Sequence, residues 1–334
     1  MEIPKKLTVS ASPHLHCGEN TRTLMLDVLL ALAPAAVMSV ILFGWRCLLL
    51  MAISVAACVG FEYGARRVLG RPNSLGDLSA VVTGLLLAFN LPANLPWWMP
   101  VIGAFVAIVI VKQFFGGIGQ NFVNPALVGR IVLLVSFPDA MAPAEWPLPL
   151  PHIAGVDTVT AASPLAALAN GTAPTLQEMF TTATAYDPLS MLLGLRPGSL
   201  GETCAAALLL GGLYLCIRRT ISPVIPLVFM GTTVAVTWAC GQNPLFHLLA
   251  GGLMLGAIFM ATDYTTCPIN FKGKILYAFG CGLLTALIRL FGNMPEGVSV
   301  AIVLMNILVP HIERITTPKP FGYVKPKKEK GAAQ

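Results

Sequence analysis

One segment of the sequence gathers small and hydroxyl-bearing residues behind a single acid. It runs from Asp157 through Thr160, Ala161 and Ala162 to Ser163. The segment is thus small, rich in hydroxyl groups and led by one carboxylate. Composition alone leaves an ordinary loop rich in Thr, Ala and Pro as the simpler interpretation.

A second segment is rich in glycine. Gly116, Gly117 and Gly119 fall within four positions, and Asn124-Pro125 follows shortly after them. Glycines let a ligand or another backbone approach closely, and Asn-Pro favours a turn that leads into the next helix. A binding loop and a tight hairpin between two helices are equally good interpretations.

Ionisable residues also fall inside apolar stretches. A charge deep in hydrocarbon costs at least about 2.5–3.5 kcal/mol, so such groups usually face protein or water. Arg130 lies in the middle of its stretch, and we expect it to face an internal cavity, to contact a bound group or to pair with a carboxylate. Asp27 and Glu62 lie near stretch ends and are expected to reach the interface, and Arg289 is expected to extend outward.

The composition places these residues in a membrane protein. The chain has 334 residues with mean hydropathy +0.76, and 11% of them are charged, whereas a soluble domain carries roughly 25%. About 20 apolar residues cross a bilayer as a helix. We predict an all-α, polytopic protein with about ten transmembrane helices, at residues 24–43, 47–65, 77–92, 97–114, 122–137, 203–217, 221–240, 244–262, 275–292 and 297–312.

The basic residues orient these spans. Most of the 21 basic residues fall at the two ends and in alternate short connections, which predicts a multi-pass protein with both termini in the cytoplasm. They form no nucleic-acid patch, and the tail 315–334 could meet anionic membrane lipid. The long connection 138–202 would then lie outside, and the segment 1–23 is expected to be a cytoplasmic N-terminus without a cleaved signal peptide.

Five spans precede this outer loop and five follow it, so a repeated unit would be inverted. The repeats would be 24–137 and 203–314, and the matching segments are Thr83-Gly84-Leu85 with Gly251-Gly252-Leu253, and Asn124-Pro125 with Asn293-Met294-Pro295. Inverted repeats with interrupted helices are typical of transporters with a site near the midplane. A stand-alone solute channel or transporter, or a structural scaffold, therefore remains an alternative. No metal site is expected, because the eight cysteines form no CxxC pair.

Together with Ser12-Pro13-His14, Trp97-Trp98-Met99 and the run from Glu296 to Ile302, these segments resemble one family over nearly the whole chain. The chain is similar to the D subunit (RnfD) of the Rnf ion-translocating electron-transport complex, which is homologous to the B subunit of the sodium-pumping NADH:quinone reductase. The resemblance implies FMN joined by a phosphoester to a hydroxyl on the outer face, and a flavin transferase that attaches it.

By this resemblance Asp157 and Thr160 match the leading acid and first hydroxyl of the attachment motif, Ala161 and Ala162 match its small pair, and Ser163 is the acceptor. The family usually has threonine there, and serine lacks only the β-methyl group. The resemblance also implies a non-covalent riboflavin, which we expect near the glycine-rich segments that include Gly116 and Gly117, and it suggests a flavin phosphate or ring oxygen as a partner for Arg130.

The implied function is electron transfer between ferredoxin and NAD⁺, coupled to translocation of Na⁺ or H⁺ by a multisubunit translocase of the bacterial inner membrane. The partners would be the other Rnf subunits A, B, C, E and G. The chain shows no nucleotide-binding motif of its own, so the NAD⁺ chemistry is expected in a partner. Moving one charge against 100 mV costs about 2.3 kcal/mol, which a redox step of similar size can supply.

Overall fold

The structure is a computed structural model of the chain. It describes residues 20–143, 146–147, 149, 160–161, 163–169, 179, 187–292 and 296–318. Within these ranges the protein is mostly helical, and two short strands are the sole sheet. The prediction of a helical membrane protein is confirmed at this level.

Four helices are long and apolar enough to cross a bilayer, counting only the described residues. They are α1 (Thr21–Phe43), α2 (Trp45–Val68), α15 (Phe271–Phe291) and α16 (Val298–Thr316). Each coincides with a predicted span to within a few residues. Leucines, isoleucines and aromatic residues cover their outer faces, as expected for surfaces in contact with lipid.

Shorter apolar helices occupy most of the other predicted spans. They are α3 (Ser79–Phe89), α4 (Met99–Phe105) continuing into the π-helical η2 (Val106–Gln113), α5 (Pro125–Ser136), α11 (Ala205–Ile217) and α12 (Val224–Ala239). The 3₁₀ turn η1 (Leu75–Asp77) precedes α3.

The predicted span 244–262 is interrupted. It consists of α13 (Pro244–Leu249), α14 (Leu253–Leu255) and the π-helical η3 (Gly256–Met260). The break falls at Gly251-Gly252, where Gly251 has φ 61°. A non-helical break at membrane depth needs other groups to satisfy the freed carbonyls.

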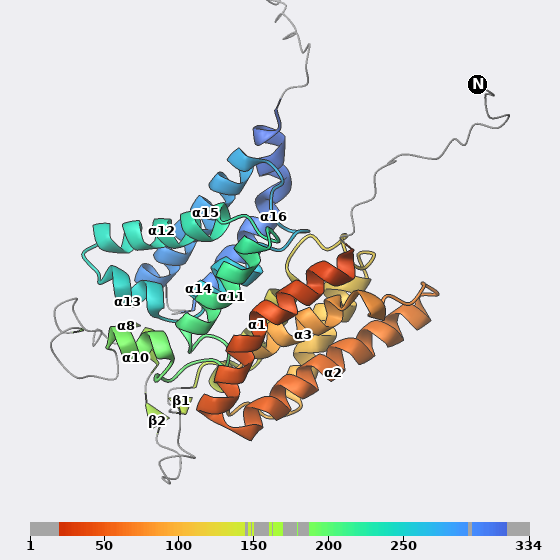
Figure 1. Ribbon diagram of the computed structural model, residues 1–334, viewed down its shortest axis with the longest axis horizontal. Coiled ribbons are helices and arrows are strands. Elements are labelled where there is room, and N and C mark those ends of the chain that lie inside the picture. The colour runs from red at the N-terminus through yellow and green to blue at the C-terminus, as the bar shows by residue number, and fades with distance from the viewer. Residues whose placement is uncertain are drawn as a thin grey trace, which may run out of the picture.

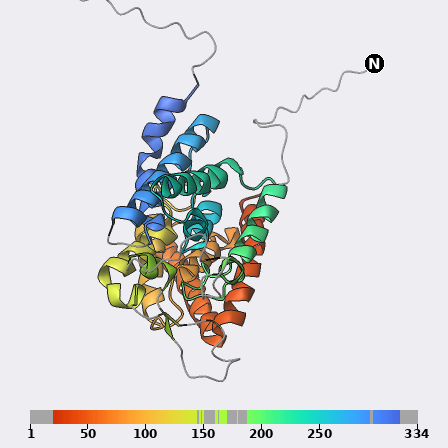
Figure 2. The ribbon, with the colours of Figure 1, turned by 90° about the vertical axis from the view of Figure 1, so that its left-hand side faces the viewer.

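The two halves of the chain form two adjoining groups of helices (Figure 1), and the perpendicular view in Figure 2 shows them packed together. Helix α1 packs on α11, and α5 packs on α16. At the α1–α11 crossing a Cβ on Gly211 would collide with the carbonyl oxygen of Ala31. Glycine at this position therefore lets the two backbones touch.

The connection between the halves contains short elements. They are α6 (Pro138–Met141), β1 (Trp146–Pro147), β2 (Thr160–Ala161), α8 (Pro164–Ala169) and α10 (Pro188–Leu193). The strands pair antiparallel, Trp146 with Ala161 and Pro147 with Thr160. In Figure 1 β1 and β2 lie at the lower end of the molecule, whereas α16 ends at the upper end. The strand pair and the end of α16 therefore lie at opposite ends of the protein.

Candidate functional site

Arg130 on α5 is the centre of a buried polar cluster. Its Nη1 donates to Asn90 Oδ1 at 2.6 Å, to Glu202 Oε1 at 3.1 Å and to Ser299 Oγ at 3.0 Å. Its Nη2 pairs with Glu296. The residue is 3% exposed, so a paired carboxylate is what makes its burial tolerable.

The cluster joins four separate segments. Asn90 caps the end of α3, Glu202 precedes α11, and Glu296 and Ser299 stand at the start of α16. Arg130 thus pairs with carboxylates, one of the expected outcomes. Its contact with a flavin stays a prediction.

Arg289 on α15 satisfies the break in the interrupted span. Its Nη1 donates to the His247 carbonyl at 2.6 Å and its Nη2 to the Ala250 carbonyl at 3.0 Å. The residue is buried, so the expectation that it extends outward was wrong. Carbonyls freed at the end of α13 attract the guanidinium inward, because a helix end without partners is costly in lipid.

Ser163 lies beside the Arg130 cluster. Its Oγ accepts the backbone N–H of Ala166 at 3.1 Å, and it lines a small hollow together with Arg196, Glu202 and Glu296. Among the other residues of the expected attachment motif, Thr160 and Ala161 form β2. Asp157 and Ala162 lie outside the described residues.

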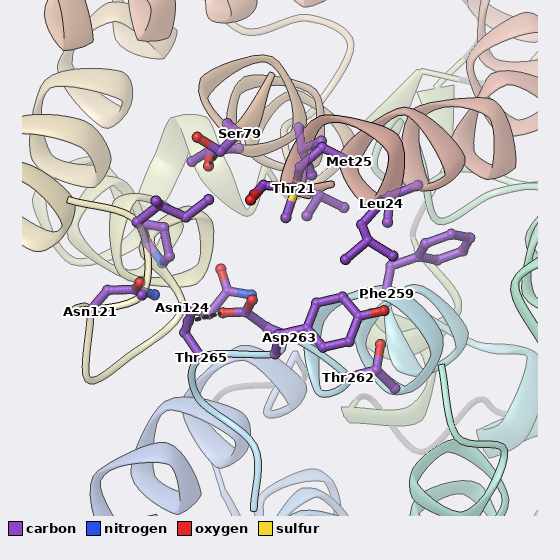
Figure 3. Close-up of a pocket in the computed structure, with 18 of the residues that line it drawn as sticks. Thr21, Leu24, Met25, Ser79, Asn121, Asn124, Phe259, Thr262, Asp263 and Thr265 are labelled. Carbon is purple, nitrogen blue, oxygen red and sulfur yellow. Dashed lines mark hydrogen bonds between the residues drawn. The ribbon is translucent and has the colours of Figure 1, made fainter. Parts of the chain in front are cut away.

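A larger pocket lies between the two halves, with a volume of about 360 Å³. Figure 3 shows it enclosed by the start of α1, by α3, by the loop that carries Asn121 and by the segment around Asp263. One face of α3 lines it with Ser79, Val82 and Thr83. Such spacing puts side chains on one side of a helix.

A fully buried carboxylate stands behind the pocket wall. Glu62 Oε2 lies 2.7 Å from Lys112 Nζ, and Gln113 Nε2 donates to Glu62 Oε1 at 3.1 Å. Lys112 Nζ also donates to Ser79 Oγ at 2.6 Å, and both Lys112 and Ser79 line the pocket. The expectation that Glu62 reaches the interface was therefore wrong, because Lys112, 50 residues later, provides a charge partner inside the protein.

Asp263 provides a second acid at the pocket. Thr265 and Thr266 donate to its Oδ2 at 2.9 and 3.2 Å. Burial raises the pKa of the Asp263 carboxyl above its usual value, and these hydrogen bonds act in the opposite direction. Asp263 lies just after η3, where the interrupted span ends.

The glycine-rich loop borders the same pocket. Gly116, Gly117 and Gly119 have φ of 130°, 105° and 86°, so all three use the conformational freedom of glycine. Gly119 lines the pocket, whereas a Cβ on Gly117 would meet Arg66 at 2.7 Å. A flavin contact of Gly116 and Gly117 stays a prediction.

The predicted turn at Asn124-Pro125 is confirmed. Asn124 Oδ1 accepts the Ala126 N–H at 3.1 Å and caps α5, and its Nδ2 donates to the Met260 carbonyl at 3.2 Å. Proline at the first helical position needs no hydrogen-bond partner. Asn124 thus links the start of α5 to the end of η3.

Sequence reasoning missed the partners of Arg130 and the burial of Arg196. Glu202 and Glu296 stand outside the predicted spans, and Arg196 was assigned to the outer loop. Each of the three lies close to a proline or glycine shortly before a predicted span, and this was a weak signal that they turn inward.

Comparisons with known proteins agree over nearly the entire chain. A sequence profile described as the NQR2, RnfD, RnfE family matches residues 8–322. The D subunit of the Na(+)-translocating ferredoxin:NAD(+) oxidoreductase complex of Acetobacterium woodii is 46% identical over 97% of this chain and 98% of its own.

Two further relatives differ in their names. The D subunit of the proton-translocating ferredoxin:NAD(+) oxidoreductase complex of Clostridium ljungdahlii is 44% identical over 96% of this chain and 98% of its own. The D subunit of the ion-translocating oxidoreductase complex of Stutzerimonas stutzeri is 40% identical over 90% of this chain and 91% of its own. One relative is named as sodium-translocating and the other as proton-translocating, and their identities to this chain are similar. Overall sequence identity therefore does not identify the coupling ion.

Proposed function

Because the chain belongs to the NQR2, RnfD, RnfE family, we propose that it is the membrane-embedded D subunit of an ion-translocating ferredoxin:NAD⁺ oxidoreductase complex. The observation that carries the proposal is the match with relatives of that name along the full length, which includes both helix groups and the connection between them. Its partners are then the other Rnf subunits, A, B, C, E and G, and ferredoxin and NAD⁺ react in those partners.

We propose that Ser163 carries FMN through a phosphoester. The Oγ–P bond forms as an anhydride P–O bond of an activated flavin donor breaks. The rest of the donor leaves as a phosphate monoester, and the hydroxyl proton passes to that leaving group or to solvent. A flavin transferase supplies this step. Ser163 fits the role because its side chain is half-buried, so a transferase can reach it. Its Oγ accepts the Ala166 N–H, and an ester oxygen can still accept this hydrogen bond.

The pocket between the halves suits a second, non-covalent flavin, riboflavin. Its volume of about 360 Å³ falls within the range of small-molecule sites. The walls are mostly apolar, including Val82, Leu86 and Phe259, with Lys112 and Asp263 as charged exceptions. An apolar pocket with few polar groups is the usual way to hold an aromatic ring in a fixed orientation.

A bound flavin supplies reversible electron transfer, and the protein supplies position and electrostatics. Lys112 and Ser79 stand at the pocket wall, and Glu62 keeps the lysine charge in place from behind. Because the charge pair is buried in a medium of low dielectric constant, its field acts strongly on the pocket. The apolar residues of α3 exclude water from the same space.

We further propose that the protein sits in the bacterial inner membrane as ten spans forming an inverted repeat of five, with both termini cytoplasmic. The packing of α1 on α11 and of α5 on α16 supports this, because those helices are first and fifth in each half and equivalent elements meet at a two-fold axis. The Ser163 segment then lies outside and the Lys112–Asp263 pocket toward the inside. The translocated ion is Na⁺ or H⁺.

Co-expression with a flavin transferase tests the covalent flavin. The denatured protein band should fluoresce under ultraviolet light, Ser163→Ala should be dark, and Ser163→Thr should fluoresce because it restores the usual acceptor. Ser136→Ala is a matched control outside the motif and should match the wild type. A dark wild-type band would refute covalent attachment, and solute flux by flavin-free protein in liposomes would favour the transporter alternative.

A further inference from the structure

The hollow beside Ser163 is small and polar. Arg196, Glu202, Thr203 and Glu296 line it with Ser163, and its volume is about 10 Å³. That is room for about one water or one oxygen atom of similar size. The hollow cannot hold a flavin ring, but it can take one oxygen of a group attached to the serine.

Arg196 brings an unused donor to this hollow. The residue is 2% exposed, and its Nη2 donates to the Glu202 carbonyl at 2.8 Å. Its Nη1 has no hydrogen-bond partner among the described residues, and neither has the Thr203 hydroxyl. A buried charged donor without an acceptor is costly, and an acceptor in the hollow would remove this cost.

The charges around the hollow call for an anion. The described charged groups that line the hollow are Arg196, Glu202 and Glu296, and Arg130 pairs with both acids. Arg289 lies next to Gly251, which also lines the hollow, and counting it leaves one positive charge in excess. The Arg289 charge interacts with those of Arg196 and Glu202. Burial lowers the pKa of Arg196 to about 10, and Glu202 opposes this change. One added negative charge would neutralise the cluster.

We propose that Arg196 Nη1, with the Thr203 hydroxyl beside it, binds the phosphate of the flavin esterified to Ser163. This inference rests on the proposed function of Ser163 as the attachment site. A phosphodiester carries one negative charge, and its oxygens match the guanidinium donors well. Because the phosphorus is bonded directly to Ser163 Oγ, a phosphate oxygen stays next to the hollow wherever the ring lies.

Free phosphate or a lipid headgroup could supply the same anion, so the test must tie the anion to the ester. Four purified proteins are compared after co-expression with the transferase: wild type, Ser163→Ala, Arg196→Gln and the double variant. The readouts are the thermal unfolding midpoint in detergent and the covalent flavin content of the denatured band. A double-mutant cycle then isolates the interaction between the two positions.

We expect Arg196→Gln to lower the unfolding midpoint of both proteins, and to lower that of the flavinylated protein by about 3–6 °C more than that of Ser163→Ala. This difference corresponds to one hydrogen bond to a charged group. Arg196→Lys keeps the charge and should keep part of this difference, and it carries the test if Arg196→Gln does not fold. Arg218→Gln, at the ion pair with Asp27, should lower both proteins equally.

Equal losses in flavinylated and Ser163→Ala protein would overturn the proposal. A second result would also overturn it. In that result, inorganic phosphate or anionic lipid raises the unfolding midpoint of Ser163→Ala only when Arg196 is present, and Arg196→Gln has no larger effect on the flavinylated protein than on Ser163→Ala. A dark wild-type band would instead refute the proposed attachment at Ser163, so the two failures are distinguishable.

Discussion

Arg130 Nη1 lies 3.1 Å from Glu202 Oε1, and this contact ties a helix of the first half to the segment that leads into the second. Residues 72 positions apart in the chain are thereby brought together inside the protein. Since Arg130 also pairs with Glu296, one guanidinium contacts two carboxylates. The cluster thus connects the two halves of the protein, and it also surrounds the proposed flavin phosphate.

These contacts predict that substituting Arg130 lowers the free energy of unfolding substantially. Arg130→Gln should destabilise the protein by about 3–5 kcal/mol, because two carboxylates lose their buried partner. The measurement is thermal unfolding of the detergent-purified protein. Adding Glu202→Gln to Arg130→Gln removes one unpaired charge and should recover part of the loss, whereas a fully stable Arg130→Gln protein with normal electron transfer would remove both roles of Arg130.

The crossing of α1 and α11 predicts a steric effect. Gly211→Ala drives a Cβ into the Ala31 carbonyl oxygen, so the two helices must separate, at about 1–3 kcal/mol. Gly231→Ala on α12 is the matched control, since no atom lies within 4 Å of its Cβ position. It should be neutral or stabilising by up to about 1 kcal/mol.

Equal midpoints for the Gly211→Ala and Gly231→Ala proteins in detergent would show that the halves do not pack as described. The comparison is direct because both substitutions add one methyl group to the middle of an apolar helix.

The pocket predicts that the two proposed flavins can be lost independently of each other. Met25→Trp fills space in the pocket between α1 and α3 (Figure 3). We therefore expect the amount of non-covalent flavin, which acid precipitation releases, to fall at least about tenfold. This fall corresponds to a steric clash of about 1.4 kcal/mol or more. The covalent fluorescence of the band should be unchanged. Leu30→Trp, on the exposed face of the same helix, should leave both flavins unchanged.

Loss of the covalent flavin in Met25→Trp, or retention of the released flavin, would argue against two separate sites. Chromatography of the acid supernatant and fluorescence of the pellet measure both quantities on one sample.

Much of the helix pattern could be predicted from the sequence, because apolar length and basic residues report directly on the bilayer. Asn124-Pro125 predicted a turn that the structure confirms, and Gly251-Gly252 marked a helix that is interrupted. These features depend on neighbouring residues alone, which is why local reasoning found them.

The site depended on contacts between distant residues. Nothing near Glu62 in the sequence shows that Lys112 faces it, and a carboxylate near the end of a span can turn either to the interface or to a buried lysine. In the same way Arg289 is drawn inward by the carbonyls of His247 and Ala250, 42 and 39 residues earlier. Such pairings follow from helix packing, which a single sequence does not give.

The face of the membrane on which the connection between the halves lies is the most direct test of the proposed flavin site. In a background without the native cysteines, Asp139→Cys and Thr317→Cys place exposed thiols in α6 and just after α16. An impermeant maleimide applied to intact cells should label Asp139→Cys at once and Thr317→Cys only after the membrane is opened. Labelling of both in intact cells, or of neither, would contradict a flavin site outside and a tail inside.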